Sequence, residues 1–439
     1  MLLSLPYWIF QMLRHGKYRR GFSERMGRVP ARILTQEIHP HQSGESKRLI
    51  WVHAVSVGEV LAVSGLISEM RRHFPDHRIV ITTTTDTGQE LARKRFGEEN
   101  VFYFPMDFTF AIRPYLRALR PELVILAETE FWPNFLHEVH ASGARIAVVN
   151  ARISDRSWPS YSRFRWALRR MLAHVDVFLT QTPEDATRLQ SIGALAERVH
   201  ITGNLKFDAT VPDSPPIVDK LRVTLHNSGA SPILVCGSTV ESEEPLLLKA
   251  FANILAAHPR AVMILAPRHP QRFDQVATLP QQTGIKSSRR SRWDSGDPSA
   301  PLSGSVFLLD TIGELAALYA LADIAFVGGS LVPRGGHNII EPAQHGVAIV
   351  VGPHTENFRE IVSLFKGHDA VRIVTPKDLA STLLQLLANG AERNELGRRA
   401  TEVLESQTGA TQRTLNALST LLADDRDPVA AAAQAAPIP

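Results

Sequence analysis

The sequence predicts an α/β fold with two doubly wound domains, and three observations support this fold class. Short apolar runs rich in β-branched residues alternate with longer helical stretches, and the alternation stops near residue 208 and resumes after residue 229. Uninterrupted apolar runs are typical of parallel strands that helices cover on both faces of a sheet. The chain has 439 residues, 44% hydrophobic and 21% charged, so it is long enough for two domains.

The first domain is predicted to span residues 21–208. Its apolar runs lie at 48–55, 78–85, 123–129, 145–150 and 176–182. Helical stretches follow them at 56–75, 87–97, 132–143, 151–175 and 183–193. Because a helix follows each run, the strands are expected to be parallel.

The second domain is predicted to span residues 229–424, after a linker at 209–228 that is rich in Pro and Ser and also contains a preparatory helix. Its apolar runs lie at 231–239, 261–269, 305–311, 323–330, 347–353 and 370–376. The polar segment 285–302 is predicted to be a surface loop. The Ala-rich tail 425–439 offers nothing to a core and is predicted to be disordered.

The N-terminal segment, residues 1–20, has an apolar start followed by basic residues. The apolar part is shorter than the roughly 20 residues of a membrane-spanning helix, and the charges follow it, which is the reverse of a signal peptide. We predict an amphipathic helix lying on a membrane surface, with a helix packed on its own domain as the alternative.

Composition narrows the chemistry. A single cysteine, Cys236, excludes an intramolecular disulfide and a Cys-based zinc site, and it is expected to be buried in its apolar run. The net charge of +4 weakly favours anionic partners and gives no indication of nucleic acid.

Ligands of open α/β sheets bind beyond the carboxyl ends of the strands, so the loops after the apolar runs are the candidate sites. Ser56, Gly58 and Glu59 open the helix after the first run. Glu59 is either part of a capping box with Ser56 or a general base for a hydroxyl group, and Gly58 would let a ligand approach the backbone.

Two acids, Glu128 and Glu130, follow the third run, and strand alternation predicts that they share a face. Compensation of the helix dipole explains one of them, so at least one is expected to face a ligand. Lys206, where the first domain ends, either holds an anionic substrate group or is a solvated side chain.

The second domain offers a phosphate site. Gly237 and Ser238 form a small-residue turn after a strand, and Arg268, followed by His269, lies between two prolines. Gly313 lies in an open helix start. The stretch GGSLVPRGGHNIIEP, residues 328–342, contains Gly335 and Gly336 before a predicted N-cap, Asn338, and an acid, Glu341. Its backbone amides are expected to bind phosphate, and Glu341 either compensates the helix dipole or accepts hydrogen bonds from ribose hydroxyls.

Over about residues 18–415 the chain resembles the 3-deoxy-D-manno-octulosonic acid (Kdo) transferases of lipopolysaccharide core synthesis. The resemblance is carried by HAVSVGE, AETEFWPN, NARISDRS, GNLKFD, APRHPQRF, DTIGELAALYALADIAFVGGSLVPRGGHNIIEPA and GPHTENF, in this order.

This resemblance implies a GT-B fold, with two Rossmann-like domains facing across a cleft, and inverting transfer of Kdo from CMP-Kdo to a lipid A precursor (lipid IVA). It implies that Glu59 is the general base, that Glu128 and Glu130 shape the acceptor and donor pocket, and that Lys206 meets substrate charge. Arg268, Gly313, Asn338 and Glu341 would hold CMP. No cofactor or metal is expected, and the inner membrane surface on the cytoplasmic side is the expected location.

Two other classes stay open on these residues. A UDP-sugar 2-epimerase also pairs two Rossmann-like domains and binds nucleotide with a similar glycine block and acid. The other class is a non-catalytic protein that binds a nucleotide sugar. Such a protein does not need three carboxylates, Glu59, Glu128 and Glu130, beside its ligand.

Overall fold

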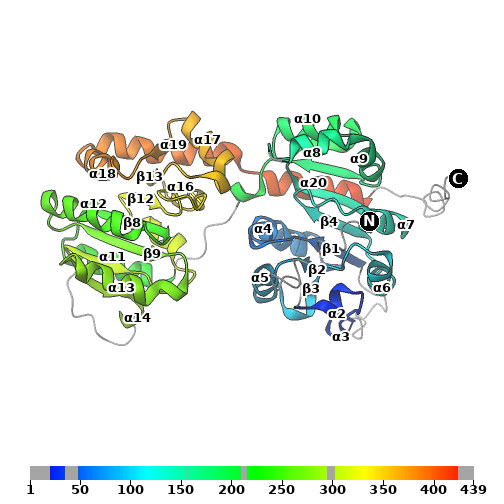
Figure 1. Ribbon diagram of the computed structural model, residues 1–439, viewed down its shortest axis with the longest axis horizontal. Coiled ribbons are helices and arrows are strands. Elements are labelled where there is room, and N and C mark those ends of the chain that lie inside the picture. The colour runs from blue at the N-terminus through cyan, green and yellow to red at the C-terminus, as the bar shows by residue number, and fades with distance from the viewer. Residues whose placement is uncertain (1–19, 35–47, 156, 209–214, 294–301, 424–439) are drawn as a thin grey trace. The chain divides into compact units, whose positions relative to one another are not determined.

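The computed structural model describes residues 20–34, 48–155, 157–208, 215–293 and 302–423 (Figure 1). The chain divides into two compact units, the first made of residues 1–209 and 408–439 and the second of residues 210–407. The predicted N-terminal amphipathic helix, apart from Arg20, and the predicted disordered tail lie outside the described residues.

Seven parallel strands form the sheet of the first unit, in the order β3-β2-β1-β4-β5-β6-β7. They are β1 (Arg48–His53), β2 (His77–Thr83), β3 (Val101–Tyr103), β4 (Leu123–Ala127), β5 (Arg145–Ala151), β6 (Val177–Thr180) and β7 (Val199–Ile201). The described helices of this unit are α2 (Phe22–Arg25), α3 (Ala31–Leu34), α4 (Val57–His73), α5 (Asp86–Phe96), α6 (Thr109–Leu119), α7 (Pro133–Ala141), α8 (Trp158–Arg163), α9 (Arg165–Leu172), α10 (Pro183–Ser191) and α20 (Ala410–Ala423), with the 3-10 turns η2 (Glu98–Asn100), η3 (Ala196–Arg198) and η4 (Leu205–Asp208).

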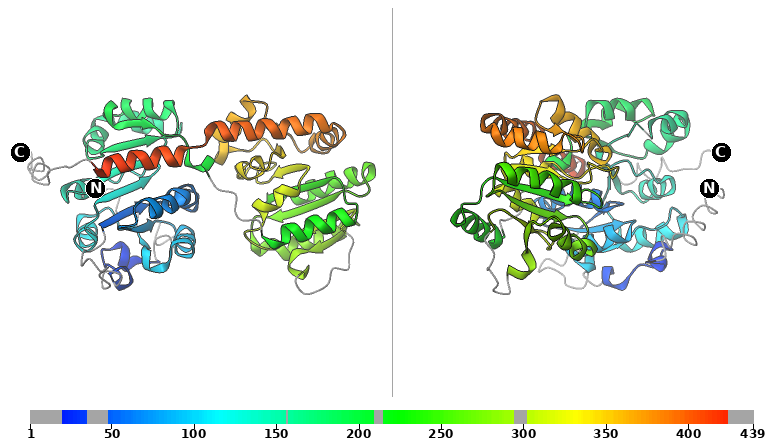
Figure 2. Two further views of the ribbon diagram at one scale, coloured as in Figure 1. Left: turned by 180° about the vertical axis from the view of Figure 1, so that it is seen from behind. Right: turned by 60° about the vertical axis from the view of Figure 1, so that its left-hand side comes forward.

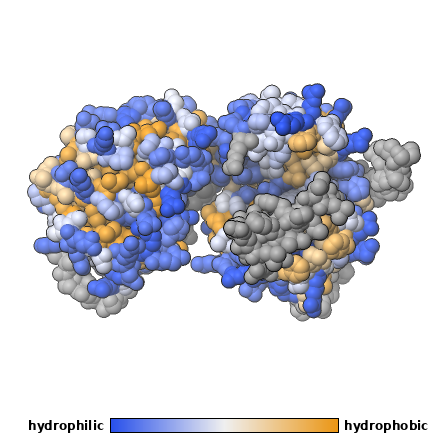
Figure 3. Space-filling view, in the orientation of Figure 1, coloured by the Kyte–Doolittle hydropathy of each residue, from blue (hydrophilic) through white to orange (hydrophobic). Residues whose placement is uncertain are grey.

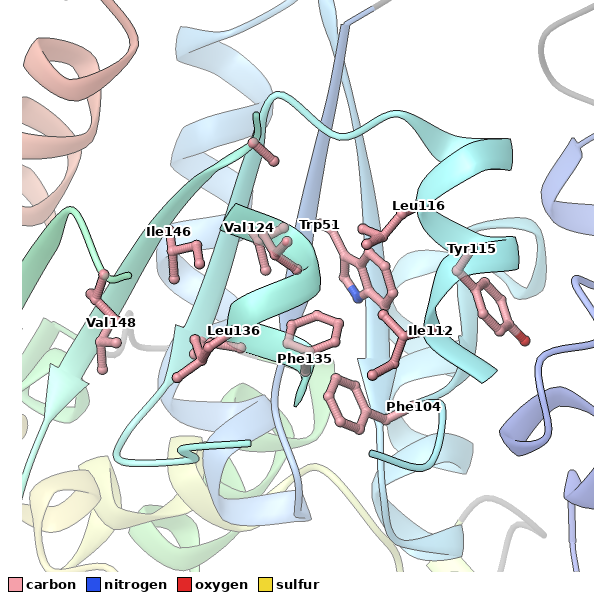
Figure 4. Close-up of a cluster of buried hydrophobic side chains, with 14 of the residues drawn as sticks. Trp51, Phe104, Ile112, Tyr115, Leu116, Val124, Phe135, Leu136, Ile146 and Val148 are labelled. Carbon is pink, nitrogen blue, oxygen red and sulfur yellow. The ribbon is translucent and has the colours of Figure 1, made fainter. Parts of the chain in front are cut away.

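The central strands of the first sheet are buried on both faces because they carry continuous apolar runs, as in β4, where every residue is apolar and buried. Alternate residues of a strand point to opposite faces. Leu49 and Trp51 of β1 therefore lie in one core cluster, and Ile50 and Val52 lie in the other. Trp51 packs edge-on against Phe135 with 5.2 Å between the ring centroids (Figure 4).

The second unit repeats this plan with seven parallel strands in the order β10-β11-β9-β8-β12-β13-β14. They are β8 (Ile233–Thr239), β9 (Val262–Pro267), β10 (Lys286–Arg289), β11 (Ser305–Leu308), β12 (Ile324–Val327), β13 (Ala348–Val351) and β14 (Arg372–Ile373). Its described helices are α11 (Pro216–Asn227), α12 (Glu244–Ala257), α13 (Phe273–Gln282), α14 (Arg290–Trp293), α15 (Leu315–Leu318), α16 (Ile340–Ala343), α17 (Arg359–Gly367), α18 (Leu379–Ala388) and α19 (Gly390–Gln407), with the 3-10 turns η5 (Pro270–Arg272), η6 (Tyr319–Leu321) and η7 (Glu356–Phe358). Figure 2 shows helices on both faces of each sheet.

Each sheet has a point where the strand order reverses. In the first unit β1 lies between β2 and β4, and in the second unit β8 lies between β9 and β12. Helices after neighbouring strands cover opposite faces at such a point and leave a crevice at the carboxyl ends of the strands. The loops after β1 and β4, and those after β8 and β12, are therefore the ligand positions that the topology favours.

The domain boundaries differ from the predicted ones. The predicted linker 209–228 contains α11, whose Val218 and Leu221 are fully buried in a core of the second unit. The predicted second domain ran to residue 424, but α20 packs in the first unit (Figure 1). Leu415 and Leu418 of α20 are buried in the same core cluster as Ile50 and Val52, which explains this position.

Two further expectations are corrected. The polar segment predicted as a loop at 285–302 contains β10 and α14 in its described part. The helix predicted at 151–175 begins only at Trp158 and divides at Phe164 into α8 and α9.

Candidate active site

Glu59 lies in the first turn of α4, directly after β1, and its side chain is 8% exposed. Its Oε2 accepts a hydrogen bond from the Val55 amide at 2.7 Å, and its Oε1 accepts one from the Ser56 hydroxyl at 3.0 Å. The predicted capping box with Ser56 is therefore not formed, because the Ser56 hydroxyl caps no helix amide and Glu59 accepts from the amide of Val55 instead of that of Ser56. Gly58 is exposed, and an added Cβ would meet only the Ser56 hydroxyl, at 3.8 Å.

The environment of Glu59 raises its pKa to about 8. Burial is the largest cause, followed by the negative charge of Glu128, and the charge of Glu130 adds to both. The hydrogen bonds from Val55 and Ser56 act in the opposite direction. A carboxylate whose pKa lies near neutral pH can take up a proton during a reaction and release it again, as a general base must.

Glu128 and Glu130 lie in the loop after β4, which is the neighbour of β1 in the sheet. The predicted strand alternation does not apply, because β4 ends at Ala127 and Glu128 has a left-handed backbone with φ of 58°. The two acids are nevertheless close enough for burial and the charge of Glu128 to raise the pKa of Glu130. Glu59, Glu128 and Glu130 form one group, called here the carboxylate cluster.

Lys206 joins this cluster from η4. Its Nζ lies 3.7 Å from Oε1 of Glu128. Buried Asn150, at the end of β5, holds the turn in place, since its Oδ1 accepts a hydrogen bond from the Leu205 amide at 3.0 Å. Asn150 opens the motif NARISDRS that carries the family resemblance, but no role was predicted for it.

In the second unit, the amides predicted to bind phosphate already hold an internal anion. The amides of Gly329, Ser330 and Leu331 donate to the carboxylate of Glu243 at 2.7, 2.9 and 2.8 Å. Glu243 is fully buried and also accepts from the Val240 amide at 3.1 Å. The first half of the glycine-rich loop is therefore fixed to the residues before α12, and its amides do not point at a ligand.

Close packing explains why the second half of the same loop contains two glycines, Gly335 and Gly336. An added Cβ on Gly335 would come within 2.4 Å of the Asn357 side chain, and one on Gly336 within 3.2 Å of the His354 carbonyl. Both glycines have positive φ, at 87° and 73°. Their lack of a side chain thus has a structural reason inside the loop.

Asn338 and Glu341 follow this loop at the start of α16. The N-cap of α16 is Ile339 and not Asn338 as predicted. The Asn338 Oδ1 accepts from the Ile340 amide at 3.1 Å, and its Nδ2 donates to Glu341 at 3.3 Å. Burial raises the pKa of Glu341, while the bond from Asn338 and the charge of Arg268 lower it. The structure therefore brings Asn338, Glu341 and Arg268 together.

Arg268 and His269 are exposed after β9, and the Arg268 amide donates to the Thr239 carbonyl at 2.8 Å. His337, which the sequence analysis left without a role, lies near both. Burial and the charges of Arg268 and His269 lower its pKa to about 4, so it is neutral at pH 7. Its Nε2 is buried without a hydrogen-bond partner in the described part of the chain. We call Arg268, His269, His337, Asn338 and Glu341 the Arg268 cluster.

The remaining candidates of the second unit lie differently from the expectation. Gly237 and Ser238 belong to β8 and do not open a helix, since α12 begins at Glu244. An added Cβ on Gly237 would meet the Tyr319 hydroxyl at 2.0 Å, so this glycine makes room for Tyr319. Gly313 has φ of 93° and open space around its Cα.

Within the described residues, no group of three or more His, Cys, Asp or Glu side chains is arranged to hold a metal ion. None of the described helices combines the length and the apolar character that crossing a bilayer requires.

Comparison with known proteins decides the family. The family model described as 3-deoxy-D-manno-octulosonic-acid transferase (kdotransferase) matches residues 20–209. The 3-deoxy-D-manno-octulosonic acid transferase of Bordetella pertussis is 36% identical over 426 residues, 94% of each chain. That of Haemophilus influenzae is 33% identical over 410 residues, 92% of each chain. The chain belongs to the Kdo transferase family.

Solved structures agree with a GT-B fold for this Kdo transferase family member. UDP-GlcNAc 2-epimerase from Neisseria meningitidis, bound to UDP-GlcNAc, matches with a TM-score of 0.56 over 85% of this chain and 100% of its own, at 13% identity. An identity this low shows the fold alone. The predicted fold class, two Rossmann-like doubly wound domains of the GT-B type, is confirmed.

Proposed function

We propose that this protein transfers Kdo from CMP-Kdo to a hydroxyl group of a lipid A precursor, with inversion at the anomeric carbon. The single observation that supports this proposal most is the carboxylate cluster. Glu59 lies at the switch point of the first sheet, with a pKa of about 8, beside Glu128 and Glu130. Membership of the Kdo transferase family supplies the substrate class.

In the proposed step, the acceptor oxygen bonds to the anomeric carbon of Kdo while the bond from that carbon to the CMP phosphate oxygen breaks. The acceptor proton passes to the Glu59 carboxylate, and CMP leaves with the bonding electrons. Attack opposite the leaving group inverts the anomeric carbon. The amide of Val55 and the hydroxyl of Ser56 hold both oxygens of Glu59 and so fix the direction of the carboxylate.

We assign CMP to the Arg268 cluster. Arg268 is an exposed cation suited to the phosphate that leaves with CMP, and Glu341 and Asn338 are suited to the hydroxyls of the ribose. A cation and hydrogen-bond donors can stabilise this leaving group, so the proposal contains no metal and no cofactor. The lipid acceptor would place the protein at the cytoplasmic face of the inner membrane.

The test is transfer from CMP-Kdo, generated in situ, to a tetraacylated lipid A precursor, with products resolved by mass. We expect a mass increase by one or more Kdo units, and the masses give their number. Folded protein that transfers no Kdo, and that instead interconverts UDP-N-acetylglucosamine and its 2-epimer, would replace the proposal by the epimerase alternative.

A further inference from the structure

We propose that α8 and α9 carry a docking surface for an anionic lipid bilayer. The surface consists of six exposed residues, called here the arginine–aromatic patch: Arg163, Phe164, Arg165, Trp166, Arg169 and Arg170. It lies on the first unit and belongs to neither of the clusters assigned to the reaction.

Two large aromatic side chains are exposed in this patch although α9 has a core to pack on. Phe164 is 54% and Trp166 is 71% exposed. The inner side of α9 is occupied by buried Leu172 and by Leu168 and Met171, which pack against the first core cluster. The helix is therefore held by other residues, and no contact among the described residues of the unit requires Trp166 to be exposed.

The charge of the patch has one sign. Between Trp158 and Val175 the sequence contains Arg163, Arg165, Arg169 and Arg170 and no Asp or Glu. None of these four arginines forms an ion pair with a carboxylate of the described residues. By contrast, Arg188 of the neighbouring α10 pairs with Asp155 at 2.6 Å. Figure 3 shows hydrophilic and hydrophobic residues mixed on one face of the molecule, so an exposed apolar residue alone is not distinctive. The distinctive feature of the patch is that arginines without an ion pair among the described residues surround an exposed Trp.

These two properties together favour a bilayer over a protein or a nucleic acid. Trp is preferred at the boundary between lipid headgroups and acyl chains, where its ring is apolar and its N–H stays hydrated. Arginines near an anionic membrane surface contribute about 1 kcal/mol each. A short helix with Trp and Arg on its outer side is therefore suited to lie on such a surface.

The patch also lies close to the carboxylate cluster. Tyr161 of α8 packs against Phe131, with 6.3 Å between the ring centroids. Burial and then the negative charge of Glu130 raise the pKa of the Tyr161 hydroxyl, so this hydroxyl lies near Glu130. One short helix thus contacts the loop after β4 and carries the start of the patch. If the proposed function holds, docking there brings a lipid acceptor to the cluster, but docking itself does not depend on that function.

The experiment places a probe beside the patch in the full chain. Ala167→Cys, exposed on α9, is labelled with an environment-sensitive fluorophore, and fully buried Cys236 leaves the new thiol as the reactive one. Vesicles of phosphatidylcholine and phosphatidylglycerol in equal parts, free of Kdo acceptor, should shift the emission to the blue. Pure phosphatidylcholine should shift it less. The matched control is Val223→Cys on α11, 59% exposed, whose emission should not change.

A second variant tests the charges. Arg165→Gln with Arg169→Gln should remove at least half of the blue shift at position 167, while circular dichroism shows that the fold is kept. If the protein sediments with the vesicles but the emission of the probe at position 167 does not shift, the proposal is wrong. If the emission shifts without lipid, and more so at higher protein concentration, the patch is a self-association surface and the proposal is also wrong. Because the vesicles carry no acceptor, neither result depends on transferase activity.

Discussion

Glu59 shows how a residue acquires a chemical role from its surroundings. The sequence predicted its place at the start of a helix and its two possible roles, because a strand, a Ser and an acid three residues later are a local pattern. It could not predict the charges of Glu128 and Glu130, which lie about 70 residues further along the chain and act on Glu59 only after β1 and β4 pair. The same limit explains why no role was predicted for Asn150 and His337, whose partners lie far from them in the sequence.

The pKa of Glu59 makes the transfer rate depend on pH. A general base must be deprotonated, so the rate should rise with pH and level off above a midpoint near the pKa of about 8. Glu128→Gln removes a negative charge that raises this pKa, so its midpoint should lie at lower pH. The measurement is the pH–rate profile of both proteins, and identical midpoints would contradict the assignment of the titration to Glu59.

The same shift affects stability. The pKa of Glu59 is raised in the folded protein above its ordinary value of 4.5, so the folded state binds the proton more tightly than the unfolded state does. This contribution to stability is present below pH 4.5 and is lost as the pH rises through about 8. The Tm of Glu59→Gln minus the Tm of the wild type should therefore be larger at pH 9 than at pH 5. Thermal unfolding followed by circular dichroism measures both differences. An equal Tm difference at both pH values would contradict the raised pKa.

At the scale of elements, sequence patterns predicted the inner strands and missed edge strands. All three missed strands lie at the edge of a sheet: β3, β7 and β10. An edge strand has one neighbour and needs no continuous apolar run, as the partly exposed KSSR of β10 shows. Polar side chains hold β10 in place: Arg289 Nε donates a hydrogen bond to Asp310 at 2.7 Å. A search for hydrophobic patterns cannot detect a strand that is stabilised in this way.

The contact between Glu243 and the glycine-rich loop gives a prediction at this scale. Glu243→Gln places an NH₂ group against backbone amides that need an acceptor, and such a buried loss costs roughly 1–3 kcal/mol. We expect a lower Tm and weaker CMP binding by calorimetry, because the loop leads into Asn338 and Glu341. Glu241→Gln, exposed three residues from α12, is the matched control and should behave as the wild type. Unchanged CMP affinity in Glu243→Gln would show that the loop does not position the nucleotide site.

For the whole molecule, the chain returns to its first unit at the end, and no local pattern predicts this. The turn η4 contacts the start of α20. Asp208 of this turn accepts hydrogen bonds from the Gly409 amide, at 2.7 Å, and from the Thr411 amide. Arg413 Nε donates to the Thr202 carbonyl at 2.8 Å. The apolar pattern of α20 is equally compatible with either sheet, so only the assembled fold decides its place.

The position of α20 predicts that a C-terminal substitution destabilises the first unit. Leu418→Ala removes a fully buried side chain from the core of the first sheet and should cost about 2–5 kcal/mol. Urea unfolding followed by tryptophan fluorescence, to which buried Trp51 contributes, measures this loss. Asn416→Ala, exposed on the same helix, is the control. A midpoint for Leu418→Ala equal to that of the control would contradict the packing of α20 on the first unit.

The most direct test of the central claim compares single-turnover Kdo transfer by the wild type, Glu59→Gln and Glu69→Gln. Glu69 lies on the same helix as Glu59, away from the carboxylate cluster, and pairs with Arg72. We predict that Glu59→Gln lowers the rate roughly a hundredfold or more, as the loss of a general base does, and that Glu69→Gln transfers at the wild-type rate. Undiminished transfer by folded Glu59→Gln would contradict the account and leave Glu59 with a structural role at the start of α4.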